Sequence, residues 1–209
     1  MKNHKHEHYF SAEPSSRLRM LKIETELLGK RLRLYSGSGV FSKSGIDLGT
    51  RTLIENACIK PGWLVLDLGC GYGAVGIAIA KAHPSCRVVM TDINRRAVML
   101  AERNVKENNV NAGVFCGDGF EPVKNLRFNT ILLNPPQTAG KRLCEGMILA
   151  SKDHLKRGGL LQLVARHRKG GRSLAEVMLK CFGNLSIAGN GAGYRVYVSE
   201  NLEHTRLRL

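Results

Sequence analysis

Short apolar segments alternate with helically spaced segments through most of the chain, from residue 63 onward. The apolar segments predict strands at Trp63–Asp67, Arg87–Thr91, Gly113–Cys116, Phe128–Leu133 and Leu160–Ala165. The segments between them carry apolar residues at helical spacing and predict helices at Ala74–Ala82, Arg95–Glu107 and Arg142–Lys156. This alternation is typical of parallel strands covered by helices, so an α/β fold is expected.

The two ends of the chain depart from this alternation. Between Leu18 and Tyr35 apolar and charged residues alternate, which predicts a β-hairpin with its turn at Gly29-Lys30. The other expected elements are a helix over Thr50–Ile59 before the alternating region and, after it, a helix at Ser173–Phe182 and strands at Asn184–Ala188 and Tyr194–Ser199. The Gly-rich link between the last two strands is too short for a helical crossover, so these strands should pair antiparallel.

Length and composition fit a single soluble domain. The chain has 209 residues, of which 43% are apolar, enough to form a core and too many for a disordered chain. We expect one domain over residues 1–209, with a basic hairpin extension at 1–45 and a catalytic core at 46–209. The core should hold a seven-stranded, mostly parallel sheet whose last strand is antiparallel. No apolar run approaches the roughly 20 residues of a membrane helix, so a cytoplasmic location without membrane contact is expected.

The six cysteines are scattered, and none belongs to a C-x-x-C pair. Neither a zinc site nor a disulfide framework is therefore expected, and the cysteines should be small core residues. We predict no metal. The sequence gives no indication of the oligomeric state.

Charge points to a polyanionic partner. The chain carries 32 Lys and Arg against 17 Asp and Glu, a net charge of +15. Such an excess favours binding to nucleic acid, because neutralising phosphates releases counterions. Residues 152–172 hold seven basic residues and one acid. Arg166, Arg168 and Lys169 follow the fifth strand and are candidates for a phosphate-binding rim, with an ordinary solvated face as the alternative.

A glycine-rich loop joins the first strand of the alternating region to its helix. Gly69, Gly71 and Gly73 allow a tight turn and a close approach to a ligand beside the helix N-terminus. Gly71-x-Gly73-x-x-Gly76 also matches a dinucleotide-binding fingerprint. Asp67 favours a different ligand, because a carboxylate there repels a pyrophosphate but can hold an ammonium group.

Acidic residues follow the next two strands. Asp92, adjoined by Ile93, lies 21 residues after Gly71, where an acid can bind a ribose; a helix N-cap is the alternative or additional role. Asp118, followed by Gly119, could accept a hydrogen bond from an adenine amino group, or could be an ordinary turn residue.

The fourth strand ends in Asn134, Pro135, Pro136 and Gln137. The Asn134 side-chain oxygen and the Pro135 carbonyl can converge on one amino group, because the prolines fix the backbone. Accepting both hydrogens of a planar NH₂ group makes its nitrogen lone pair available for attack on an electrophilic methyl. Such catalysis depends mainly on positioning. Together the glycine loop, Asp92, Asp118 and Asn134 follow four successive strands and should line one crevice.

These motifs resemble known ones. Residues 65–73 look like motif I of class I S-adenosylmethionine-dependent methyltransferases, and residues 134–136 look like the Asn/Asp-Pro-Pro-aromatic motif of amino-group methyltransferases. With residues 39–42, 46–50, 92–97 and 193–196, they resemble the methyltransferase small-domain family, especially archaeal stand-alone members. The resemblance implies a Rossmann-like fold, S-adenosylmethionine as cofactor, and guanine N2 of ribosomal RNA as target. It also implies that Asp47, Gly49 and Thr50 close the cofactor pocket.

One departure from the family pattern bears on the substrate. Gln137 stands where the wider group has the aromatic residue that stacks on the target base. Phe41 or Tyr9 could supply a ring instead, although plain core packing is the favoured interpretation of Phe41. Lys141 is a candidate for contact with RNA or the substrate rim, or a surface lysine. Protein glutamine-N5 or adenine-N6 methylation stays open, as does a non-catalytic RNA-binding role in ribosome assembly.

Overall fold

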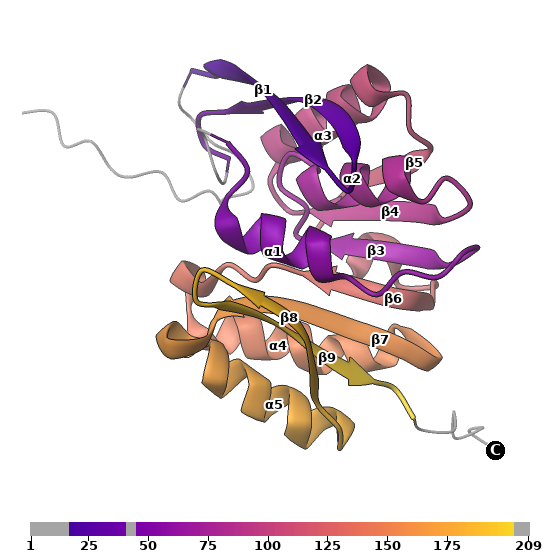
Figure 1. Ribbon diagram of the computed structural model, residues 1–209, viewed down its shortest axis with the longest axis vertical. Coiled ribbons are helices and arrows are strands. Elements are labelled where there is room, and N and C mark those ends of the chain that lie inside the picture. The colour runs from indigo at the N-terminus through magenta and orange to yellow at the C-terminus, as the bar shows by residue number, and fades with distance from the viewer. Residues whose placement is uncertain (1–16, 41–44, 203–209) are drawn as a thin grey trace, which may run out of the picture.

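The computed structural model describes residues 17–40 and 45–202 and contains a seven-stranded sheet (Figure 1). Its strands are β3 (Leu64–Leu68), β4 (Arg87–Asp92), β5 (Ala112–Cys116), β6 (Phe128–Leu133), β7 (Leu155–Arg166), β8 (Ser186–Gly191) and β9 (Tyr194–Glu200). They lie in the order β5-β4-β3-β6-β7-β9-β8. The first five strands are parallel, and β9 runs antiparallel to both of its neighbours. The predicted Rossmann-like α/β fold is confirmed.

Helices cover both faces of the sheet. One face carries α1 (Leu48–Asn56), α2 (Ala74–Ala82) and α3 (Arg95–Asn108), and the other carries α4 (Lys141–Asp153) and α5 (Arg172–Phe182). The side chains of successive residues in a strand point to opposite faces of the sheet, as in β6. Leu132 packs with the first group of helices, whereas Ile131 and Leu133 pack with the second. The short helical turns are η1 (Glu121–Val123), η2 (Gln137–Ala139) and η3 (His167–Gly171).

The order of the strands determines where a ligand can bind. The chain leaves β3 through α2 on one face and leaves β6 through α4 on the other, and β3 and β6 are neighbours in the sheet. Their carboxyl ends therefore form a topological switch point, where open α/β sheets have a crevice.

The N-terminal hairpin consists of β1 (Met20–Leu27) and β2 (Lys30–Gly37) and forms a separate two-stranded sheet. Its turn is Leu28-Gly29, one residue earlier than predicted, with φ of 50° and 68° at the two positions. Two positive φ values are typical of a type I′ turn, whose twist matches that of the strands. The apolar face of the hairpin joins the same core as α2 and α3.

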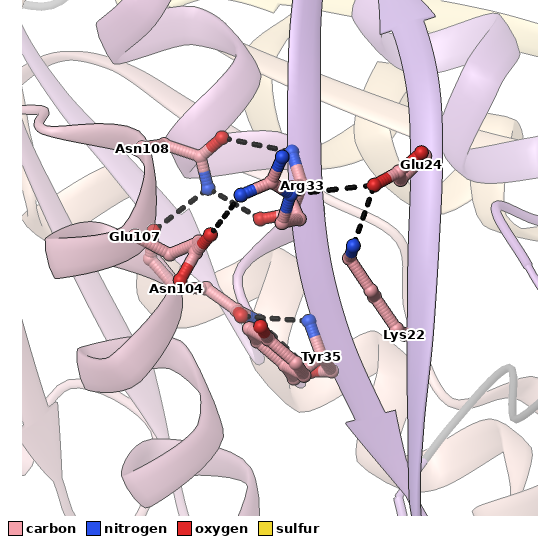
Figure 2. A network of polar contacts seen from close by, with 7 residues as sticks. All are labelled: Lys22, Glu24, Arg33, Tyr35, Asn104, Glu107 and Asn108. Carbon is pink, nitrogen blue, oxygen red and sulfur yellow. Dashed lines mark hydrogen bonds and ion pairs between the residues drawn. The ribbon is translucent and has the colours of Figure 1, made fainter.

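Two asparagines of α3 hold the free edge of β2 (Figure 2). Asn104 accepts from the N–H of Tyr35 at 2.7 Å and donates to its carbonyl at 2.9 Å. Asn108, one helical turn later, makes the same pair of bonds to Arg33 at 3.0 and 2.8 Å. Arg33 also forms ion pairs with Glu107 and Glu24. Because backbone partners repeat every two residues in a strand, side chains at i and i+4 of a helix can bond alternate residues of β2.

We expect the Asn104→Ala variant to lose about 3 kcal/mol of folding free energy. Asn104 is fully buried and also donates to the Tyr72 carbonyl, so its removal leaves one buried and two partly buried main-chain groups without this partner. Urea unfolding measures the change, with exposed Glu102→Ala on the same helix as the matched control. Equal stability of the two variants would contradict this role.

Several predicted boundaries were wrong, among them the end of α4, which lies at Asp153 rather than Lys156 because β7 already begins at Leu155. Helix α1 ends at Asn56 rather than Ile59, because the Gln162 side chain bonds both the N–H and the carbonyl of Cys58, which it holds outside the helix. Strand β7 starts at Leu155 rather than Leu160 and includes an irregularity opposite β6. Strand β8 extends into the Gly-rich link, because the turn needs only Ala192-Gly193, both with positive φ.

The prediction that the cysteines are core residues was correct for only part of the set. Cys70, Cys86 and Cys144 are buried, Cys181 is partly buried, and Cys58 and Cys116 are exposed. Within residues 17–40 and 45–202, no helix is long and apolar enough to cross a membrane.

Candidate active site

A cavity of about 300 Å³ lies at the carboxyl ends of β3, β4 and β6. Most of the predicted site residues line it: Asp47, Thr50, Asp67, Gly69, Gly71, Asp92, Ile93, Asp118, Gly119, Asn134, Pro135 and Pro136. The glycine loop, the two acids after the strands and the Asn-Pro-Pro segment therefore meet in one crevice, at the switch point of the sheet.

The first two glycines of the loop leave the backbone bare toward the cavity. Gly69 and Gly71 have φ of 70° and 58°, which residues with a Cβ rarely adopt. A Cβ on Gly71 would meet no atom within 4 Å. The loop is fixed to the end of β4, because the Thr91 carbonyl accepts from the N–H groups of Gly69 and Cys70, both at 2.9 Å. A ligand can therefore approach a rigid stretch of main chain.

Gly73 and Gly76 serve packing instead. Gly73 was predicted to touch the cofactor, but it does not line the cavity and is the N-cap of α2 with φ of 87°. A Cβ on Gly76 would lie 2.5 Å from the Met90 sulfur, so this glycine allows α2 to pack closely on β4. The glycines with the dinucleotide-like spacing therefore have two separate roles: some allow the conformation of the loop, and Gly76 allows close packing of α2.

Asp92 connects the glycine loop to the start of α3. Its Oδ2 accepts from the Gly71 N–H at 2.8 Å, and its Oδ1 accepts from the Asn94 N–H at 2.8 Å. Burial raises the pKa of the Asp92 carboxyl. The alternative that Asp92 caps α3 was wrong, because Asn94 is the N-cap and accepts from the N–H groups of Arg96 and Ala97. Asp118 is exposed and lines the cavity with Gly119.

Asp67 is almost completely buried at the bottom of the cavity. Only 3% of this residue is exposed, and its Oδ2 accepts from the Gly76 N–H at 2.9 Å. Desolvation by burial, together with the nearby Asp92 carboxylate, raises the pKa of Asp67 to about 7. A cationic group placed beside it would favour the charged form.

This raised pKa predicts that stability falls as pH increases. Between about pH 4 and pH 7 the folded chain retains the Asp67 proton that the unfolded chain has released, so folding stability decreases through this window, by about 4 kcal/mol at most. The Asp67→Asn variant keeps an acceptor for the Gly76 N–H and should show a flatter profile. Urea unfolding at pH 5 and pH 8 tests this, and parallel profiles for the two proteins would contradict it.

Asn134 is held by the first turn of α1. Its Nδ2 donates to the Thr50 hydroxyl at 3.0 Å, and that hydroxyl in turn donates to Oδ2 of Asp47. The Pro135 carbonyl accepts from the Gln137 N–H at 2.8 Å, which leaves one of its two lone pairs available. The Oδ1 atom of Asn134 and one lone pair of Pro135 are therefore the acceptors that this segment can offer to a ligand amine.

The other predicted contact residues lie outside the cavity lining. Gln137 donates to the Lys169 carbonyl at 3.2 Å, and Lys141 pairs with Glu145 on the exposed side of α4. Gly49 is buried, and a Cβ there would lie 2.8 Å from the Tyr194 ring. Phe41 and Tyr9 are outside the described residues.

The basic segment 152–172 does not form one patch. Lys156 and Arg157 lie at the amino end of β7, before Leu160, and the regular stretch from Leu160 to Arg166 alone spans roughly 20 Å. Near its carboxyl end, a hollow of about 530 Å³ is lined by Arg166, His167, Arg168, Lys169, Asn190, Ala192, Gly193, Tyr194 and Arg195. The Arg166 guanidinium lies over the Tyr194 ring, 5.1 Å from its centroid. Three of the predicted basic residues therefore meet in this hollow, whereas Lys156 and Arg157 lie far from it.

Several cavity residues were missed by sequence reasoning. Thr91 lines the cavity, and its buried hydroxyl has no hydrogen-bond partner among the described residues. Leu143 and Met147 of α4 form an apolar side of the cavity. The sequence offered no specific signal for them, because apolar residues on a helix are equally consistent with ordinary packing, and the exposure of Leu143 is seen only in the structure.

The fold and this site define a class I S-adenosylmethionine-dependent methyltransferase. The methyltransferase small domain model matches residues 31–198, and the chain belongs to that family. The match covers the hairpin strand β2, the whole parallel sheet and nearly all of β9.

Two similar proteins are a Bacillus subtilis protein of about the same length and a longer ribosomal RNA methyltransferase. The chain is 34% identical over 195 residues to YbxB of Bacillus subtilis, covering 91% of this chain and 96% of that protein. It is 33% identical over 175 residues to ribosomal RNA small subunit methyltransferase C of Haemophilus influenzae, covering 81% of this chain and 52% of that enzyme. The chain thus spans about half the length of such relatives, whereas the B. subtilis protein is of similar length.

Among solved structures, the chain resembles a 16S rRNA N2 guanosine methyltransferase of T. thermophilus, crystallised with AdoMet and guanosine. The TM-score is 0.76 and the identity 23%, over 90% of this chain and 52% of that one. At this identity the likeness shows the fold.

Proposed function

We propose that this protein transfers a methyl group from S-adenosylmethionine to the exocyclic N2 amine of guanine in ribosomal RNA, in the cytoplasm. The observation that carries the proposal is the position of Asn134 and Pro135. They line the same cavity as the glycine loop and offer two acceptors to an amine. Relatives that methylate small-subunit ribosomal RNA support the choice of substrate.

The residues of the cavity fit the proposed cofactor. The bare main chain at Gly69 and Gly71, with Asp67 beneath it, suits an amino-acid end that carries an ammonium group. Asp92 suits a ribose and Asp118 an adenine amine, and the unpartnered Thr91 hydroxyl offers a further hydrogen bond. Ile93 and Met147 add apolar surface, and Asp47 and Thr50 close the other side. When bound, S-adenosylmethionine supplies an electrophilic methyl group on a sulfonium.

The chain contributes positioning to the transfer. Asn134 Oδ1 and the free lone pair of the Pro135 carbonyl each accept one hydrogen of the guanine amine, which draws its nitrogen toward tetrahedral geometry and directs the lone pair into the cavity. Pro136 stiffens the backbone that holds both acceptors. The amine loses a proton after transfer, so no strong base is needed.

Charge beside the cavity supports an RNA substrate. The net charge is +15, and Arg166, Arg168 and Lys169 line the basic hollow that adjoins the active site through the contact of Gln137 with Lys169. This hollow suits backbone phosphates of the substrate RNA, whose contacts position without reading sequence. Lys141 is exposed on α4 near the Asn-Pro-Pro turn and could contribute to the same rim.

Mass spectrometry of nucleosides tests the proposal. Purified protein is incubated with S-adenosylmethionine and either ribosomal RNA stripped of protein or small-subunit particles, and N2-methylguanosine is the expected product. The Arg166→Ala and Arg168→Ala variants should lower the salt dependence of RNA binding by about one unit in slope each. Methylation of a protein glutamine or of adenine would replace the proposed substrate. Cofactor binding without any methylated product would indicate a non-catalytic RNA-binding role.

A further inference from the structure

We propose that Asp47 and Thr50 are positioning residues that determine which atom of the Asn134 amide faces the substrate amine. This inference rests on the proposed function, in which Asn134 accepts a hydrogen from that amine. An amide side chain offers an oxygen on one side and an NH₂ group on the other, and only the oxygen can accept. Some part of the protein must therefore select one of the two orientations.

The direction of the hydrogen bonds around Thr50 makes that selection. The Asp47 carboxylate is acceptor-only, and its Oδ1 is already bonded by the N–H groups of Gly49 and Thr50, at 2.9 and 3.1 Å. The Thr50 hydroxyl has one hydrogen, which it donates to Oδ2 of the same carboxylate. Toward Asn134 the hydroxyl can then only accept.

Asn134 must consequently present its NH₂ group to Thr50. The Nδ2 atom lies 3.0 Å from the Thr50 hydroxyl oxygen, in a place where only 6% of Thr50 is exposed. The opposite orientation would bring two acceptors together in a buried site, which is unfavourable. Oδ1 is thereby directed away from Thr50 and is left to accept from the substrate. The sequence assigned Asp47 and Thr50 to the cofactor pocket, and the geometry gives them this additional role.

Two threonines of α1 provide a matched comparison. The Thr50→Val variant removes the hydroxyl next to Asn134, whereas Thr52→Val removes one of equal burial that donates to the Leu48 carbonyl and does not contact Asn134. We expect Thr50→Val to lower kcat by about 30-fold, far more than it weakens the Kd of S-adenosylmethionine, because valine keeps the shape of the pocket wall and loses only the hydroxyl. Thr50→Ser should restore most of the lost kcat. Thr52→Val should keep kcat within about twofold.

Reversing the chain of hydrogen bonds gives a sharper test. In Asp47→Asn the N–H groups of Gly49 and Thr50 still require the oxygen at Oδ1, so the new NH₂ group points at the Thr50 hydroxyl. The hydroxyl hydrogen has then lost its carboxylate acceptor, and it regains a partner when Asn134 rotates to present its oxygen to Thr50 and its NH₂ group to the substrate. We expect a loss in kcat of about 100-fold, since a donor then faces the substrate amine.

A second substitution should repair this defect. In the Asp47→Asn/Asn134→Asp double variant the hydroxyl donates to one carboxylate oxygen at position 134, and the other oxygen accepts from the substrate amine. We expect the double variant to be at least about tenfold more active than Asp47→Asn alone, although Asn134→Asp by itself lowers activity, because two carboxylates then compete for one hydroxyl hydrogen. Hydrogen-bond direction predicts this recovery, and the Thr50→Val comparison, which changes no charge, tests the same chain of hydrogen bonds independently.

The outcomes distinguish a failure of the hydrogen-bond relay, which runs from Asp47 through Thr50 to Asn134, from a failure of the proposed function. Single-turnover methylation and cofactor titration are measured for wild type first, and absence of any methylated product from wild type overturns the proposed function. If wild type is active and the losses of the two single variants simply multiply in the double variant, or if Thr50→Val and Thr52→Val behave alike, Asp47 and Thr50 serve only as the cap of α1 and the relay is wrong.

Discussion

Replacing Asn134 by alanine is expected to lower the rate of methyl transfer by about 10³-fold while the Kd of S-adenosylmethionine stays within about twofold. The side chain follows β6, beside the end of β3, and its hydrogen bond among the described residues goes to the Thr50 hydroxyl rather than to the main chain of the glycine loop. In the proposed function its oxygen accepts from the substrate amine. Its loss removes an acceptor that is needed only for the reaction.

Two separate measurements check this division of labour. Calorimetry gives the affinity for the cofactor, and single-turnover assays with saturating RNA give the rate of transfer. Asn111→Ala, an exposed asparagine between α3 and β5, is the matched control and should leave both quantities unchanged. Equal losses of affinity and rate in Asn134→Ala would show that Asn134 supports the pocket rather than the reaction.

The Asp92→Ala variant should show the opposite pattern, with affinity for S-adenosylmethionine lowered by about 100-fold or more. Asp92 is proposed to bind the ribose, and it also holds the glycine loop by accepting from the Gly71 N–H. Hydrogen bonds to a charged group contribute about 1.5 to 3 kcal/mol each. The loss of two such bonds therefore corresponds to at least about a 100-fold increase in the Kd of S-adenosylmethionine. Transfer measured at saturating cofactor should fall much less.

An aspartate outside the cavity provides the control for the loss of a negative charge. Asp153 is exposed at the end of α4, away from the cavity, and Asp153→Ala should bind the cofactor as wild type does. Asp92→Asn retains one acceptor and should fall between the two. Wild-type affinity in Asp92→Ala would remove Asp92 from the ribose site.

The fold and the location of the site were predictable because they depend on patterns in single segments. Alternating apolar runs gave the parallel strands, and β6 and α2 were predicted with the bounds that the structure has. Polar residues that directly follow such strands converge at one edge of the sheet, which is why the sequence alone predicts that Asp92, Asp118 and Asn134 share one crevice.

Features that depend on contacts between distant segments were not predictable in this way. Gln162 bonds both the N–H and the carbonyl of Cys58, 104 positions earlier, and so ends α1 before that residue. The orientation of Asn134 depends on Thr50, 84 positions earlier. Likewise, the length of β7 separates basic residues that are close in sequence. In each case the local pattern permits several arrangements, and the tertiary partner selects one.

The paired asparagines of α3 have a consequence for solubility as well as for stability. A strand at the border of a two-stranded sheet exposes main-chain groups that could template pairing with another polypeptide. Here the amides of Asn104 and Asn108 occupy those groups at Arg33 and Tyr35. Loss of both asparagines would therefore leave β2 as an unpaired edge strand. Intermolecular β-aggregation would then accompany the weaker packing of the hairpin on α3.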